Sequence, residues 1–146
     1  MDLIIRKMTE TDLEPLFELL SDPLVMEYLE PPYTKEETGH FLRRAGLSNP
    51  PLIYAVENND CFIGYVIYHD YDEDSVEIGW VLHPEYWGKG YASYLTERMI
   101  GWAFLSKKQL VIECSPEQNL SQHLAQKHGF NYIDTIDGLD VFRLKQ

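Results

Sequence analysis

The stretch Gly79-Trp80-Val81-Leu82-His83-Pro84-Glu85-Tyr86-Trp87-Gly88-Lys89-Gly90-Tyr91-Ala92 joins the end of an apolar strand to the start of a helix. Apolar residues recur at helical steps of three and four from about Tyr91 onward. The glycines at 88 and 90 let the backbone approach a ligand closely. The first N–H groups of the helix have no intrahelical partner and carry a partial positive charge, to which Lys89 adds a full one. This stretch therefore predicts a site for a phosphorylated ligand.

Two widespread phosphate loops do not fit these residues. A Walker loop needs glycine five positions before Gly88 and Ser or Thr after Lys89, but His83 and Gly90 stand there. A dinucleotide fingerprint needs a third glycine where this chain has Ser93. Both classes of nucleotide site are excluded.

The segment Trp87-Gly88-Lys89-Gly90-Tyr91-Ala92 resembles the Gln/Arg-x-x-Gly-x-Gly/Ala pyrophosphate loop of the GCN5-related N-acetyltransferases (GNAT). Trp87 replaces the Gln or Arg that many members have. The runs Glu77-Ile78-Gly79-Trp80 and His83-Pro84-Glu85-Tyr86-Trp87 are similar to the branch that acetylates the N-termini of ribosomal proteins. The resemblance implies that acetyl-CoA binds as co-substrate. It assigns the pyrophosphate to Trp87, Gly88, Lys89, Gly90, Tyr91 and Ala92, and the pantetheine arm to the backbone of Trp80, Val81 and Leu82.

The periodicity of the chain predicts strands and helices in the order β-α-α-β-β-β-α-β-α-β-β. Strands are expected at residues 3–6, 52–57, 61–69, 75–82, 109–114, 130–135 and 139–144. Helices are expected after a cap at Thr9 or Thr11, after a capping box at residues 34–37, and at residues 90–106 and 118–128. A helix that crosses over between two strands favours parallel pairing. The fold class is α/β with a mixed, twisted sheet of six to seven strands and about four helices, which is the GNAT order. We expect one domain over residues 1–146.

Glu77 is the candidate general base. Val76, Ile78, Trp80 and Leu82 are expected on one face of their strand, which turns Glu77 to the other face. Its position matches the glutamate that members of the resembled family use as base, often through a water. To work near neutral pH, its pKa would have to rise through burial.

The helix at residues 118–128 carries the expected contacts to the thiol end of the cofactor. In the resembled family an Asn-x-x-Ser/Ala pattern precedes the closing Gly-Phe, here residues 129–130. This places Ser121 at the serine that the ribosomal-protein branch uses beside the cofactor sulfur, with Gln118 at the asparagine position and Asn119 next to it. Ala125 stands where many relatives have a tyrosine that serves as general acid. The general acid therefore stays open between Ser121 and a water.

Composition limits the remaining choices. Net charge is −12, from 24 acidic and 12 basic side chains, which disfavours nucleic acid and attracts a cationic amine. No apolar run approaches the roughly 20 residues of a membrane helix, and no signal peptide is expected. The two cysteines, Cys61 and Cys114, are expected as buried reduced thiols of a cytoplasmic protein, and no metal spacing is present.

These observations predict an acetyl-CoA-dependent N-acetyltransferase that transfers the acetyl group directly to a primary amine. The acceptor is either a protein N-terminus or a small molecule. The alternative is a GNAT-like module that binds acyl-CoA without turnover. No membrane partner and no metal are expected, and relatives are often monomers or homodimers.

Overall fold

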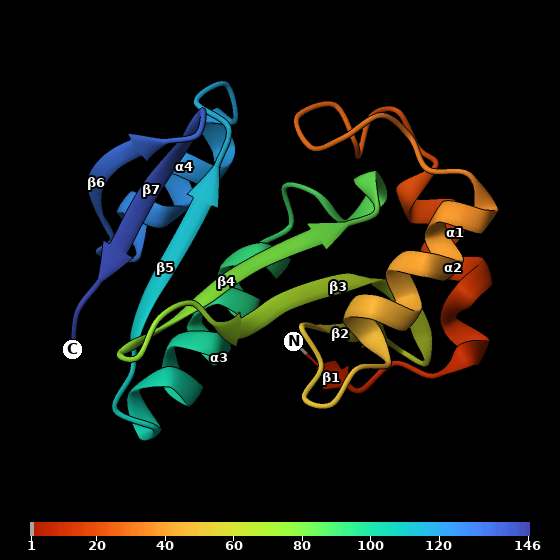
Figure 1. Cartoon of the computed structure of the whole chain (residues 1–146), viewed down its shortest axis with the longest axis horizontal. Helices are drawn as coiled ribbons and strands as arrows, with labels where there is room; N and C mark the ends of the chain where they lie inside the picture. Colours follow the sequence, from red (N-terminus) through yellow and green to blue (C-terminus); the bar gives the residue numbers. More distant parts are fainter. Residues whose placement is uncertain (1) are drawn as a thin grey trace. The chain divides into compact units, whose positions relative to one another are not determined.

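The computed structural model describes residues 2–146 and contains seven strands and four α-helices (Figure 1). The strands are β1 (Leu3–Arg6), β2 (Ile53–Asn58), β3 (Cys61–Asp70), β4 (Ser75–Leu82), β5 (Gln109–Cys114), β6 (Asn131–Ile136) and β7 (Leu139–Leu144). The helices are α1 (Leu13–Leu20), α2 (Lys35–Phe41), α3 (Tyr91–Leu105) and α4 (Asn119–Lys127). The strands pair in the order β1-β2-β3-β4-β5-β7-β6. β4 and β5 are parallel, while β1–β2, β2–β3, β5–β7 and β6–β7 are antiparallel, so the predicted mixed sheet is confirmed.

The chain divides into two compact units, and β3 and β4 each run from one into the other. The first unit comprises the residues through Ile67 together with Trp80–Tyr91. The second comprises Tyr68–Gly79 together with Ala92–Gln146.

In the first unit, α1 and α2 pack against each other, as the orange ribbons of Figure 1 show. The predicted capping box starts α2: the Thr34 side chain accepts a hydrogen bond from the Glu37 N–H, and Glu37 accepts one from the Thr34 N–H. A π-helical turn at Leu42–Gly46 continues α2. The buried core of this unit consists of Met8, Leu16, Leu19, Leu20, Val25, Met26, Leu42, Ala45, Ile53, Ala55, Tyr65 and Val81.

A buried ion pair fixes the start of α1. Arg6 donates through Nη1 and Nη2 to the two carboxylate oxygens of Asp12, at 2.9 and 2.8 Å. The Thr9 N–H donates to the same carboxylate at 2.8 Å, and Thr9 is the N-cap of the 3-10 turn that leads into α1. Burial acts to raise the pKa of Asp12, but the Arg6 and Thr9 hydrogen bonds outweigh it, so the pKa is lowered.

In the second unit, one face of α3 is buried through Leu95, Met99 and Ala103. The Trp102 ring packs edge-on against Tyr68 at the end of β3, with 5.6 Å between the ring centroids. Helix α4 contacts β5, beside which it lies in Figure 1, and its end is closed by Gly129 at φ +89°, the expected left-handed cap.

Two expectations were wrong. Cys61 is exposed, because it directly follows the tight turn in which Asn59 and Asp60 both have positive φ. Cys114 is buried as expected, and burial raises the pKa of its thiol to about 11. The second error concerns β4: Val81 is buried while Trp80 is only half-buried, so burial does not alternate over the whole strand. The backbone of β3 approaches that of β4 closely at Gly64, since a Cβ on Gly64 would lie 2.1 Å from the Val81 carbonyl oxygen.

Candidate functional site

The predicted site residues fall in both units. Those in the first are Trp80, Val81, Leu82, Trp87, Gly88, Lys89, Gly90 and Tyr91, and those in the second are Glu77, Ala92, Gln118, Asn119 and Ser121. Each group is described within its own unit.

The loop after β4 is held at its beginning by three kinds of contact. The His83 N–H donates to the Ile63 carbonyl on β3 at 2.9 Å. A short 3-10 turn at Pro84–Tyr86 follows. The Trp87 indole N–H then reaches back to the Leu82 carbonyl at 2.8 Å. The start of the loop is therefore fixed against the end of its own strand.

The glycines of the loop have the backbone conformation that the predicted phosphate site requires. Gly88 and Gly90 have φ values of +70° and +84°, a region that other L-residues rarely adopt. A Cβ placed on Gly88 would meet no heavy atom of residues 2–146 within 4 Å. Lys89, between them, is exposed. The backbone of the loop is open to a ligand, and its side-chain cation is free to turn toward one.

Tyr91 closes the loop and begins α3. Its ring centroid lies 5.7 Å from that of Tyr86. Its hydroxyl accepts a hydrogen bond of 3.4 Å from the Asn58 side chain at the end of β2. Both ends of the loop are thus anchored within the first unit, and the exposed glycines lie between the anchors.

Glu77 lies on β4 at the point where this strand pairs in parallel with β5, opposite Val111. Its side chain is 23% exposed, and one carboxylate oxygen lies 3.8 Å from His69 Nε2. Burial raises the pKa of Glu77, the charge of His69 lowers it, and the charge of Glu113 on β5 raises it; the outcome is a raised pKa. The expected shift of this carboxyl group toward neutral pH is present.

The residues expected near the thiol lie at the start of α4. Gln118 is the residue before the helix, and its side-chain oxygen accepts a hydrogen bond of 3.3 Å from the Ser115 N–H. Asn119 is exposed and Ser121 is half-buried, while Ala125 is fully buried. Gln118, Asn119 and Ser121 therefore lie at the start of α4, and their contacts to the thiol end of the cofactor stay a prediction.

Sequence reasoning missed two pairs in the second unit. Ser93 in the first turn of α3 lies 2.8 Å from His128 Nε2 at the end of α4. Burial lowers the pKa of His128, which favours the neutral ring as acceptor of the Ser93 hydroxyl proton. The second pair is His69 with Glu77. It was detectable, because the two residues lie symmetrically about the Tyr71–Ser75 hydrogen bond that closes the β3–β4 turn.

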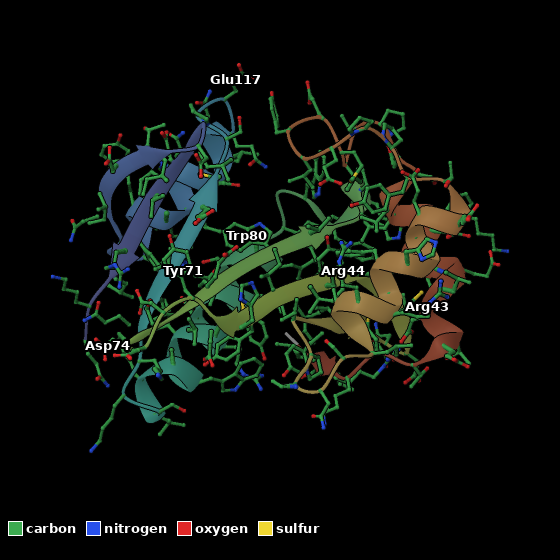
Figure 2. All side chains as sticks on the ribbon, in the orientation of Figure 1. Arg43, Arg44, Tyr71, Asp74, Trp80 and Glu117 are labelled. Carbon is green, nitrogen blue, oxygen red and sulfur yellow. The ribbon has the colours of Figure 1, made fainter. Side chains whose placement is uncertain are left out.

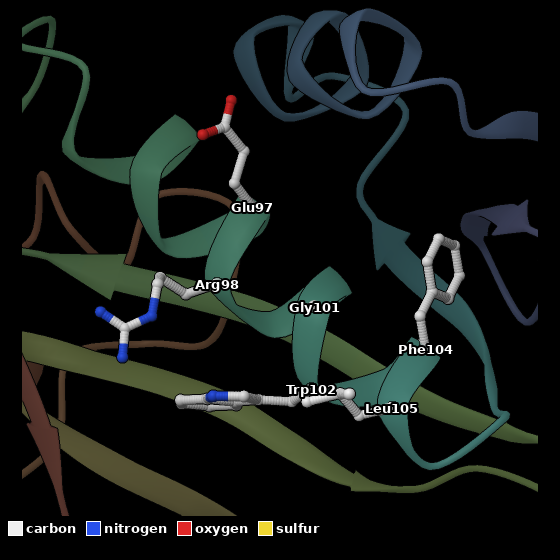
Figure 3. A pocket seen from close by; sticks show the side chains of 6 residues that line it. All are labelled: Glu97, Arg98, Gly101, Trp102, Phe104 and Leu105. Atoms are coloured by element: carbon white, nitrogen blue, oxygen red, sulfur yellow. The ribbon is translucent and has the colours of Figure 1, made fainter.

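A surface hollow lies on the exposed side of α3 (Figure 3). It is lined by Glu97, Arg98, Gly101, Trp102, Phe104 and Leu105. The Arg98 guanidinium lies 5.9 Å from the ring centroids of both Tyr94 and Trp102. None of the predicted site residues lines this hollow, so we do not place the chemistry there.

Comparison with known proteins agrees with the observed fold. Residues 2–131 match the acetyltransferase (GNAT) domain. The chain belongs to the GNAT acetyltransferase family, and it is an acetyltransferase. The non-catalytic alternative therefore loses its support.

Individual relatives match over nearly the whole chain. The uncharacterized N-acetyltransferase YnaD of Bacillus subtilis is 31% identical over 134 residues, which cover 87% of this chain and 78% of YnaD. The crystal structure of a GNAT-family acetyltransferase from Bacillus anthracis has a TM-score of 0.85 at 27% identity, covering 98% of this chain and 93% of that one. A spermidine N-acetyltransferase from Vibrio cholerae, solved with CoA and spermine, has a TM-score of 0.79 at 23% identity, covering 97% and 93% of the two chains. This last likeness shows the fold alone.

Membrane-spanning and metal-binding features are both missing from residues 2–146. No helix there is long and apolar enough to cross a membrane. No group of three or more His, Cys, Asp or Glu residues in that range is arranged to hold a metal ion.

Proposed function

We propose that this chain, acting as a single domain over residues 1–146, transfers the acetyl group of acetyl-CoA directly to a primary amine. The observation that carries the proposal is Glu77: a half-buried carboxyl group with a raised pKa, on the strand that leads into the glycine loop. A general base works best when its pKa lies near the working pH, and the acceptor ammonium must lose a proton before it can attack.

Acetyl-CoA would supply the thioester-activated acetyl group. We assign its pyrophosphate to Trp87, Gly88, Lys89, Gly90, Tyr91 and Ala92. The open space over Gly88 and the positive φ values of both glycines support this assignment, because a side chain there would occupy the space that the phosphates need. The Vibrio cholerae neighbour was solved in complex with CoA, which supports CoA as the class of ligand.

The remaining cofactor contacts are assigned from the family resemblance. The backbone of Trp80, Val81 and Leu82 would pair with the pantetheine arm. Gln118, Asn119 and Ser121 lie together at the start of α4 and would contact the thiol end. In this assignment the Ser121 hydroxyl donates a hydrogen bond to the departing thiolate, which would otherwise be protonated by water.

Two acceptor classes follow from different observations. The similarity of residues 77–80 and 83–87 to the branch that acetylates ribosomal-protein N-termini favours a peptide α-amine. The net charge of −12 favours a polycation, and a fold neighbour is named for spermidine. Location in the cytoplasm, the absence of nucleic-acid partners and a monomeric or dimeric state stay predictions.

The test is free-thiol release from acetyl-CoA with a panel of polyamines, aminoglycosides and N-terminal peptides, read against the hydrolysis rate without acceptor. Acceptor-dependent release that Glu77→Gln abolishes, with CoA binding retained, would support the proposal and identify the acceptor. Equal release by wild type and Glu77→Gln would reject Glu77 as base. No raised melting temperature with CoA would reject the cofactor.

A further inference from the structure

A polar cluster in the second unit surrounds the Glu77 carboxylate. His69 comes from the end of β3, Tyr71 from the β3–β4 turn and Glu113 from β5. Figure 2 shows Tyr71 beside β5. The Tyr71 hydroxyl donates a hydrogen bond to the Glu113 carboxylate. His69 and Glu77 face each other across the hairpin, two residues before and two residues after the Tyr71–Ser75 hydrogen bond. Side chains at such directly opposed positions interact.

The hydrogen bonds of His69 determine which of its ring nitrogens can take up a proton. Nδ1 lies 2.9 Å from the carbonyl oxygen of Asp70. A carbonyl only accepts, so Nδ1 carries the hydrogen and donates it. In the neutral ring Nε2 is then the basic atom, and it lies 3.8 Å from Glu77 Oε1. That distance is longer than a hydrogen bond, and catalytic contacts of this kind often tighten only when substrate is bound.

We propose that His69 is a positioning residue that takes the proton from Glu77 after each acetyl transfer and releases it to water. The proposal rests on the proposed function, in which Glu77 is the base. It adds the step that returns Glu77 to its charged form for the next acceptor.

The protons of one turnover can be followed through this pair. The acceptor ammonium loses its first proton to Glu77, breaking an N–H bond and forming an O–H bond. The proton released when the amide forms goes to the departing thiolate sulfur. The Glu77 proton then moves to His69 Nε2, and the imidazolium gives it to bulk water through its exposed edge, since the His69 side chain is 26% exposed. Throughout, the second ring hydrogen stays on Nδ1 and is donated to the Asp70 carbonyl oxygen.

The surrounding charges favour a proton shared by the two groups. The negative charge of Glu113 disfavours a negative charge on Glu77, whereas the positive charge of a protonated His69 favours it. Tyr71 is held neutral, because burial and its bond to Glu113 raise its pKa. The charge of Arg143 on β7 acts to lower the pKa of Tyr71, and Arg143 itself forms an ion pair with Asp72 at 3.2 Å. These charges and the 3.8 Å separation of the two side chains support proton transfer between Glu77 and His69.

The kinetic test replaces His69 by Gln, which keeps a donor toward Glu77 but cannot accept the proton. We expect kcat to fall about tenfold or more, with KM and CoA affinity unchanged and a shifted pH profile of kcat. In His69→Ala, added imidazole should restore turnover in proportion to its concentration. The matched control is His40→Gln, because His40 forms a similar pair with Glu36, at 3.9 Å, on the exposed surface of α2. Full activity of His69→Gln, or a loss in His69→Ala that imidazole does not rescue, would overturn the proposal.

A second measurement does not depend on turnover. Nitrogen-15 NMR of the His69 ring should show the hydrogen on Nδ1 in the neutral form, and ring nitrogen chemical shifts that differ between wild type and Glu77→Gln at the same pH. An Nε2–H tautomer, or ring nitrogen shifts unaffected by Glu77→Gln, would refute the coupling of the two side chains. If these spectra behave as expected but no amine is acetylated, the proposed function fails while the coupling of the pair stands.

Discussion

Gly88→Glu should abolish CoA binding and leave the fold intact. Gly88 has φ +70°, and a Cβ added to it would have no heavy atom of residues 2–146 within 4 Å, so the substitution costs only the left-handed backbone strain of about 1–2 kcal/mol. For a chain of this length the melting temperature should drop by about 2–4 °C per kcal/mol. A carboxylate about 5 Å from one phosphate charge, at an effective dielectric constant of about 20, repels it by about 3 kcal/mol. Affinity for CoA should then fall by more than about 100-fold.

Thermal denaturation with and without CoA measures both effects. At a CoA concentration of about 100 times the wild-type Kd, bound CoA stabilises the wild type by about 2.7 kcal/mol, and Gly88→Glu should lose nearly all of this. Gly138→Glu is the matched control, because Gly138 in the β6–β7 turn has φ +81° and an equally open Cβ position among the described residues. It should show the same strain and an unchanged response to CoA. A wild-type response in Gly88→Glu would refute the loop as the phosphate site.

Four further substitutions test other parts of the structure. Glu77→Gln should lower kcat by about 10²–10⁴-fold at pH 7. The pKa of Glu77 is raised on folding, so the charge of its carboxylate destabilises the folded state as pH rises above about 4.5. The melting temperature of the variant should therefore exceed that of wild type at pH 8 and equal it at pH 4. Asp12→Asn should cost about 1.5–3 kcal/mol in urea unfolding at pH 7, since it removes charged hydrogen bonds of a partly buried ion pair. The pKa of Asp12 is lowered on folding, so the difference should vanish as pH falls below about 4. Gly64→Ala should destabilise the folded protein by more than about 4 kcal/mol, because its Cβ would lie 2.1 Å from the Val81 carbonyl oxygen. Gly101→Ala, in the open hollow of α3, should stabilise it by about 0.5–1 kcal/mol. Thermal denaturation measures both.

The sequence predicted those elements whose boundaries are set by local chemistry. β4 and β5 begin and end at the predicted residues, because turn-forming residues bound two short apolar runs. Asn59–Asp60 and Asp137–Gly138 form tight turns in the gaps between the strands predicted on either side, with positive φ at all four residues. These signals need only neighbouring residues, so one sequence suffices to locate them.

Contacts between distant elements could not be predicted in this way. The Ser93–His128 pair joins residues 35 positions apart, and neither residue has a neighbour in sequence that indicates the other. The failed alternation of β4 has a similar cause, since it depends on how closely Gly64 lets β3 approach the Val81 backbone. The His69–Glu77 pair lies between these cases: counting outward from the predicted turn would have located it.

Trp87 shows how a departure from the family pattern can be explained by local contacts. The Gln or Arg that many relatives carry at this position has polar side-chain donors, whereas the indole has one ring N–H, and here it donates to the Leu82 carbonyl at 2.8 Å. This bond spans the 3-10 turn and joins the end of β4 to the beginning of the loop. Trp87 therefore shapes the loop, and the side-chain positive charge of the proposed phosphate site comes from the exposed Lys89. Removing the indole should loosen the loop, while removing Lys89 should weaken phosphate binding in a salt-dependent way.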